Sequence, residues 1–204
     1  MSDVFTPEDF SHYGRIIRVL KSVVAKTFHI RAEQDLFFTA PTFITRIDES
    51  LPWKVQGIHD EYWHTHVDMN NTAHYHYSGL LYLSTYNKDF TGGRFKLYSA
   101  NKNNNLQDRP GSKRSKKHQS MEEEKDLKLV LEPAAGRVVM FTSGPEHPHR
   151  VERVTSGQRI VLSFWFSCDS KREFEIFLDG KAHTAFSRKI GQAIHAKRSQ
   201  QRNG

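Results

Sequence analysis

The chain opens with hydrophobic residues that recur at the spacing of an α-helix. This repeat runs through Tyr13, Ile16, Ile17, Leu20, Val23, Val24 and Phe28. Before it, Thr6-Pro7-Glu8-Asp9 is typical of a helix start, because Thr can cap the first turn, Pro fits there, and acids suit the positive end of the helix dipole. The pattern therefore predicts an amphipathic helix within an N-terminal helical support over residues 1–35.

Near residue 36 the hydrophobic pattern changes. From Leu36 to about Trp165, short segments rich in Phe, Val, Ile, Tyr and Thr alternate with Gly, Pro and Asn. Such segments are typical of antiparallel strands, so we expect a mainly β domain over residues 36–168. Residues 99–128 interrupt it with Asn-rich, basic and then acidic sequence, which predicts a mobile surface loop inserted between two strands.

Beyond Cys168 the helical period returns, which predicts C-terminal helices and a tail over residues 169–204. From Lys181 onward there are six Lys or Arg residues and no Asp or Glu. Most of the net charge of +7 therefore lies in this tail. A charge run of this kind favours a solubilising or partner-docking tail over a nucleic-acid-binding surface.

Length and composition indicate one globular domain. The chain has 204 residues, of which 37% are hydrophobic and 26% are charged. Its single cysteine, Cys168, cannot form an internal disulfide, which favours a reducing compartment. The first residues lack the features of a signal peptide, and no apolar run is long enough to span a bilayer. We therefore expect a soluble cytoplasmic or nuclear protein, and the sequence does not predict its oligomeric state.

Three residues suggest metal chemistry. His66 and Asp68 are two positions apart, so on a strand both side chains face the same side. This pair alone is a weak signal in a chain with 12 histidines. His149 supplies a second imidazole, and two imidazoles with one carboxylate hold one face of an octahedral Fe(II), leaving the other open. His64 is a weaker candidate because no carboxylate lies two residues beyond it.

A second group of residues predicts an anion-binding pocket. In the segment from Arg159 to Phe166, one face is apolar and the other presents Arg159, Val161, Ser163 and Trp165. A buried guanidinium needs an anionic partner, which a dicarboxylate would provide. Tyr82 follows Ser78 and Leu80 on another inward row and could bind the same carboxylate, or it could be an ordinary core aromatic. Ser163, on the same face as Arg159, is a further candidate for binding a ligand in this pocket.

The order and spacing of several motifs resemble a known enzyme family. These motifs are His66-x-Asp68, Tyr82-Leu83-Ser84, Gly92-Gly93-Arg94-Phe95, Glu132-Pro133-x-x-Gly136-Arg137-Val138-Val139-Met140-Phe141 and His149-x-Val151-x-x-Val154-x-x-Gly157-x-Arg159. Over about residues 40 to 167 they resemble the prolyl 4-hydroxylase branch of the 2-oxoglutarate and Fe(II)-dependent dioxygenases. The offsets from His149 to Arg159 match that branch, which favours His149 over His147.

The resemblance implies a fold, a set of cofactors and residue roles. The fold would be a double-stranded β-helix, a cupin-like jelly roll, with flanking helices. The cofactors would be Fe(II), 2-oxoglutarate and O2, with ascorbate in support. His66, Asp68 and His149 would bind the iron, Arg159 would pair with the distal carboxylate of 2-oxoglutarate, and Tyr82 would hydrogen-bond to it. One similar family member is membrane-anchored.

The resemblance also implies hydroxylation of an unactivated C–H bond, most simply on a protein or peptide side chain, with release of succinate and CO2. One alternative is a non-catalytic jelly roll that binds the metal or the keto acid. Another is nucleic-acid demethylation, because Arg153 and Arg159 are spaced like a paired-arginine motif, although their distance from His149 disfavours it. Arg94 departs from the acidic residue or Thr that often follows the Gly-Gly pair.

Overall fold

The computed structural model describes residues 7–39, 43–49, 62–100 and 126–174. It divides the chain into two compact units, one formed by Met1–Ala40 with Ser167–Gly204 and the other by Pro41–Phe166. Most of the inserted loop expected at 99–128 and most of the C-terminal helices expected in 169–204 lie outside the described residues. In the described part of the chain, no helix combines the length and hydrophobicity needed to cross a bilayer.

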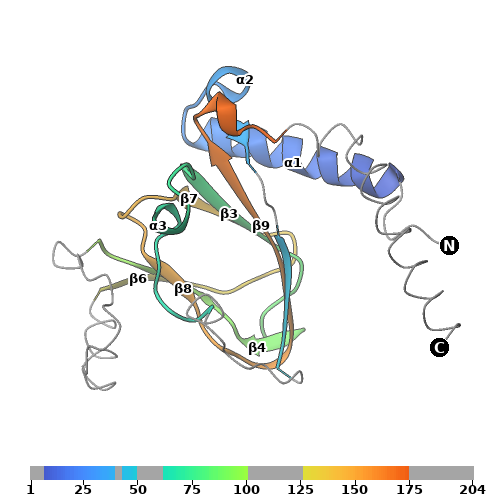
Figure 1. The fold of residues 1–204 in the computed structure, drawn as a ribbon. Coiled ribbons are helices and arrows are strands. Elements are labelled where there is room, and N and C mark those ends of the chain that lie inside the picture. The colour runs from blue at the N-terminus through green and yellow to red at the C-terminus, as the bar shows by residue number, and fades with distance from the viewer. Residues whose placement is uncertain (1–6, 40–42, 50–61, 101–125, 175–204) are drawn as a thin grey trace, which may run out of the picture. The chain divides into compact units, whose positions relative to one another are not determined.

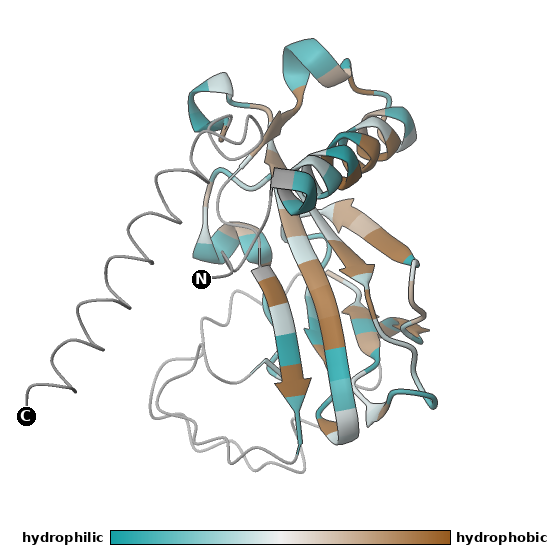
Figure 2. Cartoon of the chain, turned by 90° about the vertical axis from the view of Figure 1, so that its right-hand side faces the viewer, coloured by the Kyte–Doolittle hydropathy of each residue, from teal (hydrophilic) through white to brown (hydrophobic). Residues whose placement is uncertain are grey.

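The first unit contains the helix that the hydrophobic repeat predicts. It comprises α1 (Pro7–Thr27), α2 (Ala32–Asp35), β1 (Phe37–Phe38) and the short 3-10 helix η2 (Ser170–Arg172). Ile17, Leu20 and Val24 of α1 are buried, as expected for one stripe of an amphipathic helix. Figure 2 shows hydrophobic and hydrophilic residues on different sides of α1.

The second unit is built from antiparallel strands, as the sequence predicts. The larger sheet contains β2 (Phe43–Asp48), β3 (Tyr77–Tyr82), β4 (Phe90–Gly92), β7 (Val138–Thr142) and β9 (Val154–Ser167, whose last residue belongs to the first unit). The smaller sheet contains β5 (Phe95–Tyr98), β6 (Leu127–Leu131) and β8 (His149–Val151). Figure 1 shows these strands as two separate sheets, which is the layered arrangement of a jelly roll. The mainly β prediction is therefore confirmed.

The long strand β9 organises the larger sheet. It pairs with β2, β3 and β4, and β3 in turn pairs with β7. The register places Ser78 opposite Trp165 and Tyr82 opposite Val161. Because neighbours in register share a face of the sheet, Ser78, Tyr82, Trp165 and Arg159 lie on the same side. Figure 2 shows hydrophobic residues along most of β9 and hydrophilic residues near its start, beside β2.

The segment that carries His66 and Asp68 is not a regular strand. His66 forms an isolated antiparallel bridge with His149, in which each backbone N–H donates to the other's carbonyl oxygen at 2.9 Å. Val67 is extended, and Asp68 begins the short helix α3 (Asp68–Asn71). We expected His66 and Asp68 to lie on one strand. The structure shows extended backbone at His66 and Val67, whereas Asp68 is helical. The extended residue between them still leaves the side chains of His66 and Asp68 on one side.

We expect Gly79→Ala to destabilise the larger sheet. Gly79 lies opposite Phe164, and a Cβ atom at Gly79 would come within 2.1 Å of the Phe164 ring. Because Phe164 is fully buried, its ring has little space to move, and overpacking typically costs about 1–3 kcal/mol. Urea denaturation should show this loss in the free energy of unfolding. Adding Phe164→Leu should recover part of it, and strictly additive losses in the double variant would contradict the clash.

Candidate metal centre

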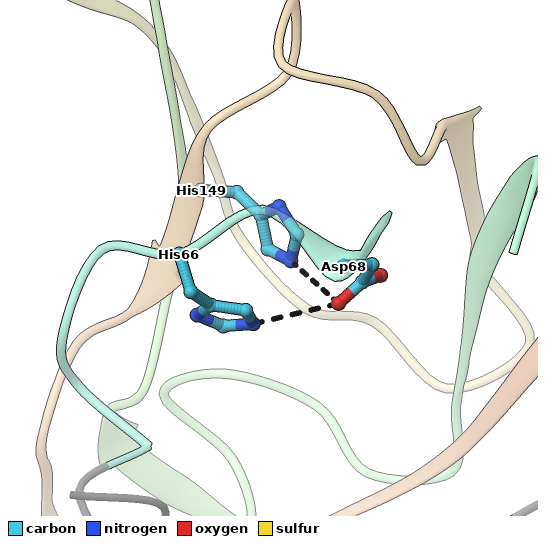
Figure 3. A group of neighbouring side chains, drawn as sticks. All are labelled: His66, Asp68 and His149. Atoms are coloured by element: carbon cyan, nitrogen blue, oxygen red, sulfur yellow. Dashed lines mark ion pairs between the residues drawn. The ribbon is translucent and has the colours of Figure 1, made fainter. Parts of the chain in front are cut away.

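Three side chains converge in the second unit to form a candidate metal centre. His66, Asp68 and His149 each offer one ligand atom, and these atoms lie within 4.8 Å of one another. Asp68 Oδ1 is 3.6 Å from His66 Nε2 and 3.8 Å from His149 Nε2. Figure 3 shows both imidazoles directed at the same carboxylate oxygen. Two nitrogens and one oxygen are a donor set that suits non-haem Fe(II).

Backbone carbonyls set the orientation of both imidazoles. His66 Nδ1 is 3.1 Å from the carbonyl oxygen of His64, and His149 Nδ1 is 3.0 Å from that of His147. A carbonyl can only accept a hydrogen bond, so both Nδ1 atoms must carry the proton. In the neutral form of each imidazole this leaves the lone pair on Nε2, the nitrogen that would bind a metal. His64 and His147, the two rival histidines, contribute their backbone oxygens here.

Burial keeps His149 neutral. Its ring lies 5.4 Å from that of Phe95 and 4.7 Å from that of Phe141, measured between centroids. Removal from water and, to a smaller extent, the nearby His66 together lower the pKa of His149 to about 4, against the opposing effect of Asp68. The imidazole is thus unprotonated near neutral pH, as a metal ligand must be.

The second oxygen of Asp68 is held by two donors. Ser78 Oγ donates to Asp68 Oδ2 at 2.5 Å, and the indole Nε1–H of Trp165 donates to the same oxygen at 3.0 Å. The strand pattern placed Ser78 and Trp165 on the inward face. It did not predict that they meet Asp68, because that contact depends on how α3 sits against the sheet.

Arg159 and Tyr82 form a separate buried polar pair. Arg159 is 2% exposed and Tyr82 is fully buried, with the guanidinium carbon 5.4 Å from the centre of the phenol ring. Arg159 Nε donates to the carbonyl oxygen of Gly93 at 3.0 Å. Burial lowers the pKa of Arg159 and raises that of Tyr82. The predicted inward position of both residues agrees with this geometry.

Two atoms of this pair have no hydrogen-bond partner among the described residues. They are Arg159 Nη2 and the Tyr82 hydroxyl, both fully removed from solvent. The guanidinium and the phenol are close enough to shift each other's pKa, but they are not in hydrogen-bonding geometry. An unsatisfied buried polar group costs about 1–3 kcal/mol, and more when it is charged. A carboxylate placed here would accept hydrogen bonds from both atoms and neutralise the guanidinium. The pair therefore fits a dicarboxylate ligand.

Gly93 allows Arg159 to reach this position. Its φ is +65°, which favours glycine, and a Cβ atom there would lie 2.9 Å from Arg159 Cδ. The Gly92-Gly93 motif thus has a steric role beside the arginine. Ser163, by contrast, is half-buried opposite Leu80, and among the described residues no hydrogen bond or ion pair joins it to the metal-ligand group or to Arg159.

The antiparallel β fold, the two histidines and one aspartate that converge in it, and its buried arginine together indicate a metal-dependent protein. Residues 53–167 match the model of the 2OG-Fe(II) oxygenase superfamily, and the chain belongs to this family. The resemblance drawn from the motifs is confirmed. Membership implies Fe(II) as cofactor and 2-oxoglutarate and O2 as co-substrates. The three converging donors are compatible with Fe(II), and the Arg159–Tyr82 pair is compatible with 2-oxoglutarate.

One curated relative matches most of the chain, and another matches somewhat less than half of it. It is 37% identical to "2-oxoglutarate and iron-dependent oxygenase domain-containing protein 3" of Rattus norvegicus over 84% of this chain and 45% of the relative. It is 35% identical to "Prolyl 3-hydroxylase 2" of Gallus gallus over 46% of this chain and 10% of that protein. The chain therefore spans less than half the length of these relatives. A solved Pseudomonas putida prolyl-4-hydroxylase is 17% identical, with a TM-score of 0.45, over 82% of this chain and 70% of that one.

We expect the metal-free protein to lose stability as the pH falls from about 6.5 to about 4, because His149 has a lower pKa when folded than when unfolded. In that range the unfolded chain binds a proton that the folded chain does not. The loss attributable to His149 could reach about 3 kcal/mol. Urea denaturation across this range should show a smaller pH dependence in His149→Leu. Parallel curves for the two proteins would contradict the assignment.

Proposed function

We propose that this chain is an Fe(II)- and 2-oxoglutarate-dependent dioxygenase that hydroxylates an unactivated C–H bond, most simply on a protein side chain. The observation that supports this most directly is the convergence of His66, Asp68 and His149 around one point. Bound Fe(II) would activate O2 while 2-oxoglutarate is converted to succinate and CO2, and one oxygen atom would enter the substrate C–H bond.

In this proposal the three convergent residues are the metal ligands. His66 and His149 would bind through Nε2, because hydrogen bonds to backbone carbonyls occupy their Nδ1 atoms. Asp68 would bind through Oδ1, the oxygen that faces both rings. Three ligands on one face leave the remaining coordination positions to the keto acid and O2.

Arg159 and Tyr82 would hold the far carboxylate of 2-oxoglutarate. Each has a buried donor that no described residue satisfies, and the guanidinium also supplies the positive charge that a carboxylate needs. The hydrogen bond from Nε to Gly93 fixes the guanidinium plane, so little rotational freedom is lost on binding. Ser163 remains a weaker candidate for cofactor binding, on the basis of its strand face alone.

A protein or peptide substrate is the proposal that the relatives favour. One similar protein is named a prolyl 3-hydroxylase and one similar structure a prolyl-4-hydroxylase. Prolyl 4-hydroxylase-like specificity for this chain is therefore a starting point for a peptide screen. Ascorbate, which would return oxidised iron to Fe(II), belongs in that assay as a reductant.

The first test is anaerobic titration of the metal-free protein with Fe(II) and 2-oxoglutarate. We expect a broad visible charge-transfer band that needs both additions, because the keto acid would chelate the metal. Arg159→Ala should weaken 2-oxoglutarate binding by tenfold or more, about 1.4 kcal/mol, and leave Fe(II) binding nearly unchanged.

Arg153→Ala is the matched control, because Arg153 is exposed and its guanidinium stacks on Trp63 at 4.1 Å. It should leave 2-oxoglutarate binding unchanged. Equal affinity in the Arg159→Ala variant would refute the carboxylate role. A band without succinate formation, in an assay with a broad set of peptides, would favour the non-catalytic binding module over the dioxygenase.

The ligand assignment has a separate test. Asp68→Ala and His66→Ala should each abolish the band and lower the bound Fe(II) from one per chain to near zero, because two remaining protein ligands hold Fe(II) weakly. Circular dichroism and thermal melting of the metal-free variants provide the check on folding. Full iron stoichiometry in either folded variant would be incompatible with this centre.

A further inference from the structure

The two oxygens of the Asp68 carboxylate have different surroundings. Oδ1 faces the Nε2 atoms of the two histidines at 3.6 and 3.8 Å. Oδ2 points the other way and accepts hydrogen bonds from Ser78 Oγ at 2.5 Å and Trp165 Nε1 at 3.0 Å. One oxygen is therefore available to a metal, and the other is occupied by protein donors.

Both donors are themselves held in place. The Trp165 indole stacks on Tyr75, with ring centroids 5.0 Å apart and planes 14° from parallel, and Tyr75 is buried. Ser78 is 2% exposed, and its Oγ lies 2.7 Å from Ser143 Oγ. Because Ser78 gives its only hydroxyl proton to Asp68, it must accept the proton of Ser143. Hydrogen bonds in such a chain strengthen one another.

Ser143 also anchors the backbone beside Asp68. The carbonyl oxygen of Ser143 accepts a hydrogen bond from Met69 N at 3.0 Å. Ser143 directly follows β7. This strand pairs with β3, and β3 carries Ser78. The start of α3 is thus fixed to the residue that follows β7, and the Asp68 side chain is fixed to β3 and β9. The carboxylate has its orientation before any metal arrives.

We propose that Ser78 and Trp165 are positioning residues that restrict Asp68 to binding the metal through Oδ1 alone. The proposal rests on the function proposed above. It adds an explanation of how the metal's remaining coordination positions are kept free for the keto acid and O2. A carboxylate that turned to bind with both oxygens would occupy one more coordination position. The keto acid and O2 together need the three positions that a single-oxygen aspartate leaves open.

Removing a hydrogen-bond partner of a metal ligand typically lowers metal affinity by about 10- to 100-fold. Trp165→Phe removes the N–H donor and keeps an aromatic ring against Tyr75, so the packing is largely preserved. Ser78→Ala removes the hydroxyl, and Ser78→Thr retains it. These variants separate the hydrogen bonds to Asp68 from the bulk of the side chains.

The test is titration of the metal-free protein with Co(II), followed by visible absorption. We expect Trp165→Phe and Ser78→Ala to weaken Co(II) binding by tenfold or more and to change the Co(II) absorption spectrum, because Asp68 can then turn toward two-oxygen binding. Ser78→Thr should restore both the affinity and the spectrum of the original protein. Melting temperatures without metal serve as the check on folding.

Matched controls lie elsewhere in the same unit. Trp63→Phe changes a tryptophan whose ring contacts Arg153 and Tyr62, and Ser84→Ala changes a buried serine bonded to the backbone of Ile160. Both controls should bind Co(II) as the original protein does. Affinity and spectrum unchanged in Trp165→Phe and Ser78→Ala would overturn the positioning role.

The test also distinguishes the positioning role from the centre itself. Loss of Co(II) binding in His66→Ala, together with unchanged binding in Trp165→Phe and Ser78→Ala, would overturn the positioning role and leave the proposed centre standing. Co(II) binding that does not depend on His66 would overturn the centre, and with it the positioning role.

Discussion

The candidate centre depends on one short backbone contact, the antiparallel bridge between His66 and His149. Two hydrogen bonds of 2.9 Å join segments that are far apart in the chain and bring the imidazole centroids to 4.4 Å. Two imidazoles have little mutual attraction, so the side chains could not hold this arrangement by themselves. The pairing of β5 with β8, in which Leu97 lies opposite His149, supports the bridge from the other side. The backbone therefore assembles the donors before any ion can bind.

The charged groups of Asp68 and Arg159 differ in how far the protein satisfies their hydrogen bonds. Around Asp68, Oδ2 receives two hydrogen bonds within the protein, so that oxygen needs nothing further. Around Arg159, one guanidinium nitrogen and the Tyr82 hydroxyl remain buried without partners among the described residues. A satisfied group fixes a geometry, whereas an unsatisfied group favours a ligand that would complete it. The first property suits a metal ligand, and the second suits a site for an exchangeable co-substrate.

β9 connects these two sites. Its inward face carries both Arg159 and Trp165, and the register sets Tyr82 opposite Val161 and Ser78 opposite Trp165. One strand thus fixes the position of Arg159 relative to Trp165, which donates a hydrogen bond to Asp68. A pocket built on strands is held more precisely than one built on loops.

The sequence alone determined the α1 helix, the strand-rich centre, the inward face of β9 and the residues that meet at the centre. These signals are local or depend on fixed spacing: hydrophobic period, alternation, and the offsets from His149 to Arg159. Only the tertiary structure decided that Asp68 begins a helix, that Ser78 and Trp165 share its oxygen, and that Arg94 pairs with Glu152 at 2.8 Å. Such contacts depend on strand register and long-range pairing, which a periodic pattern does not encode.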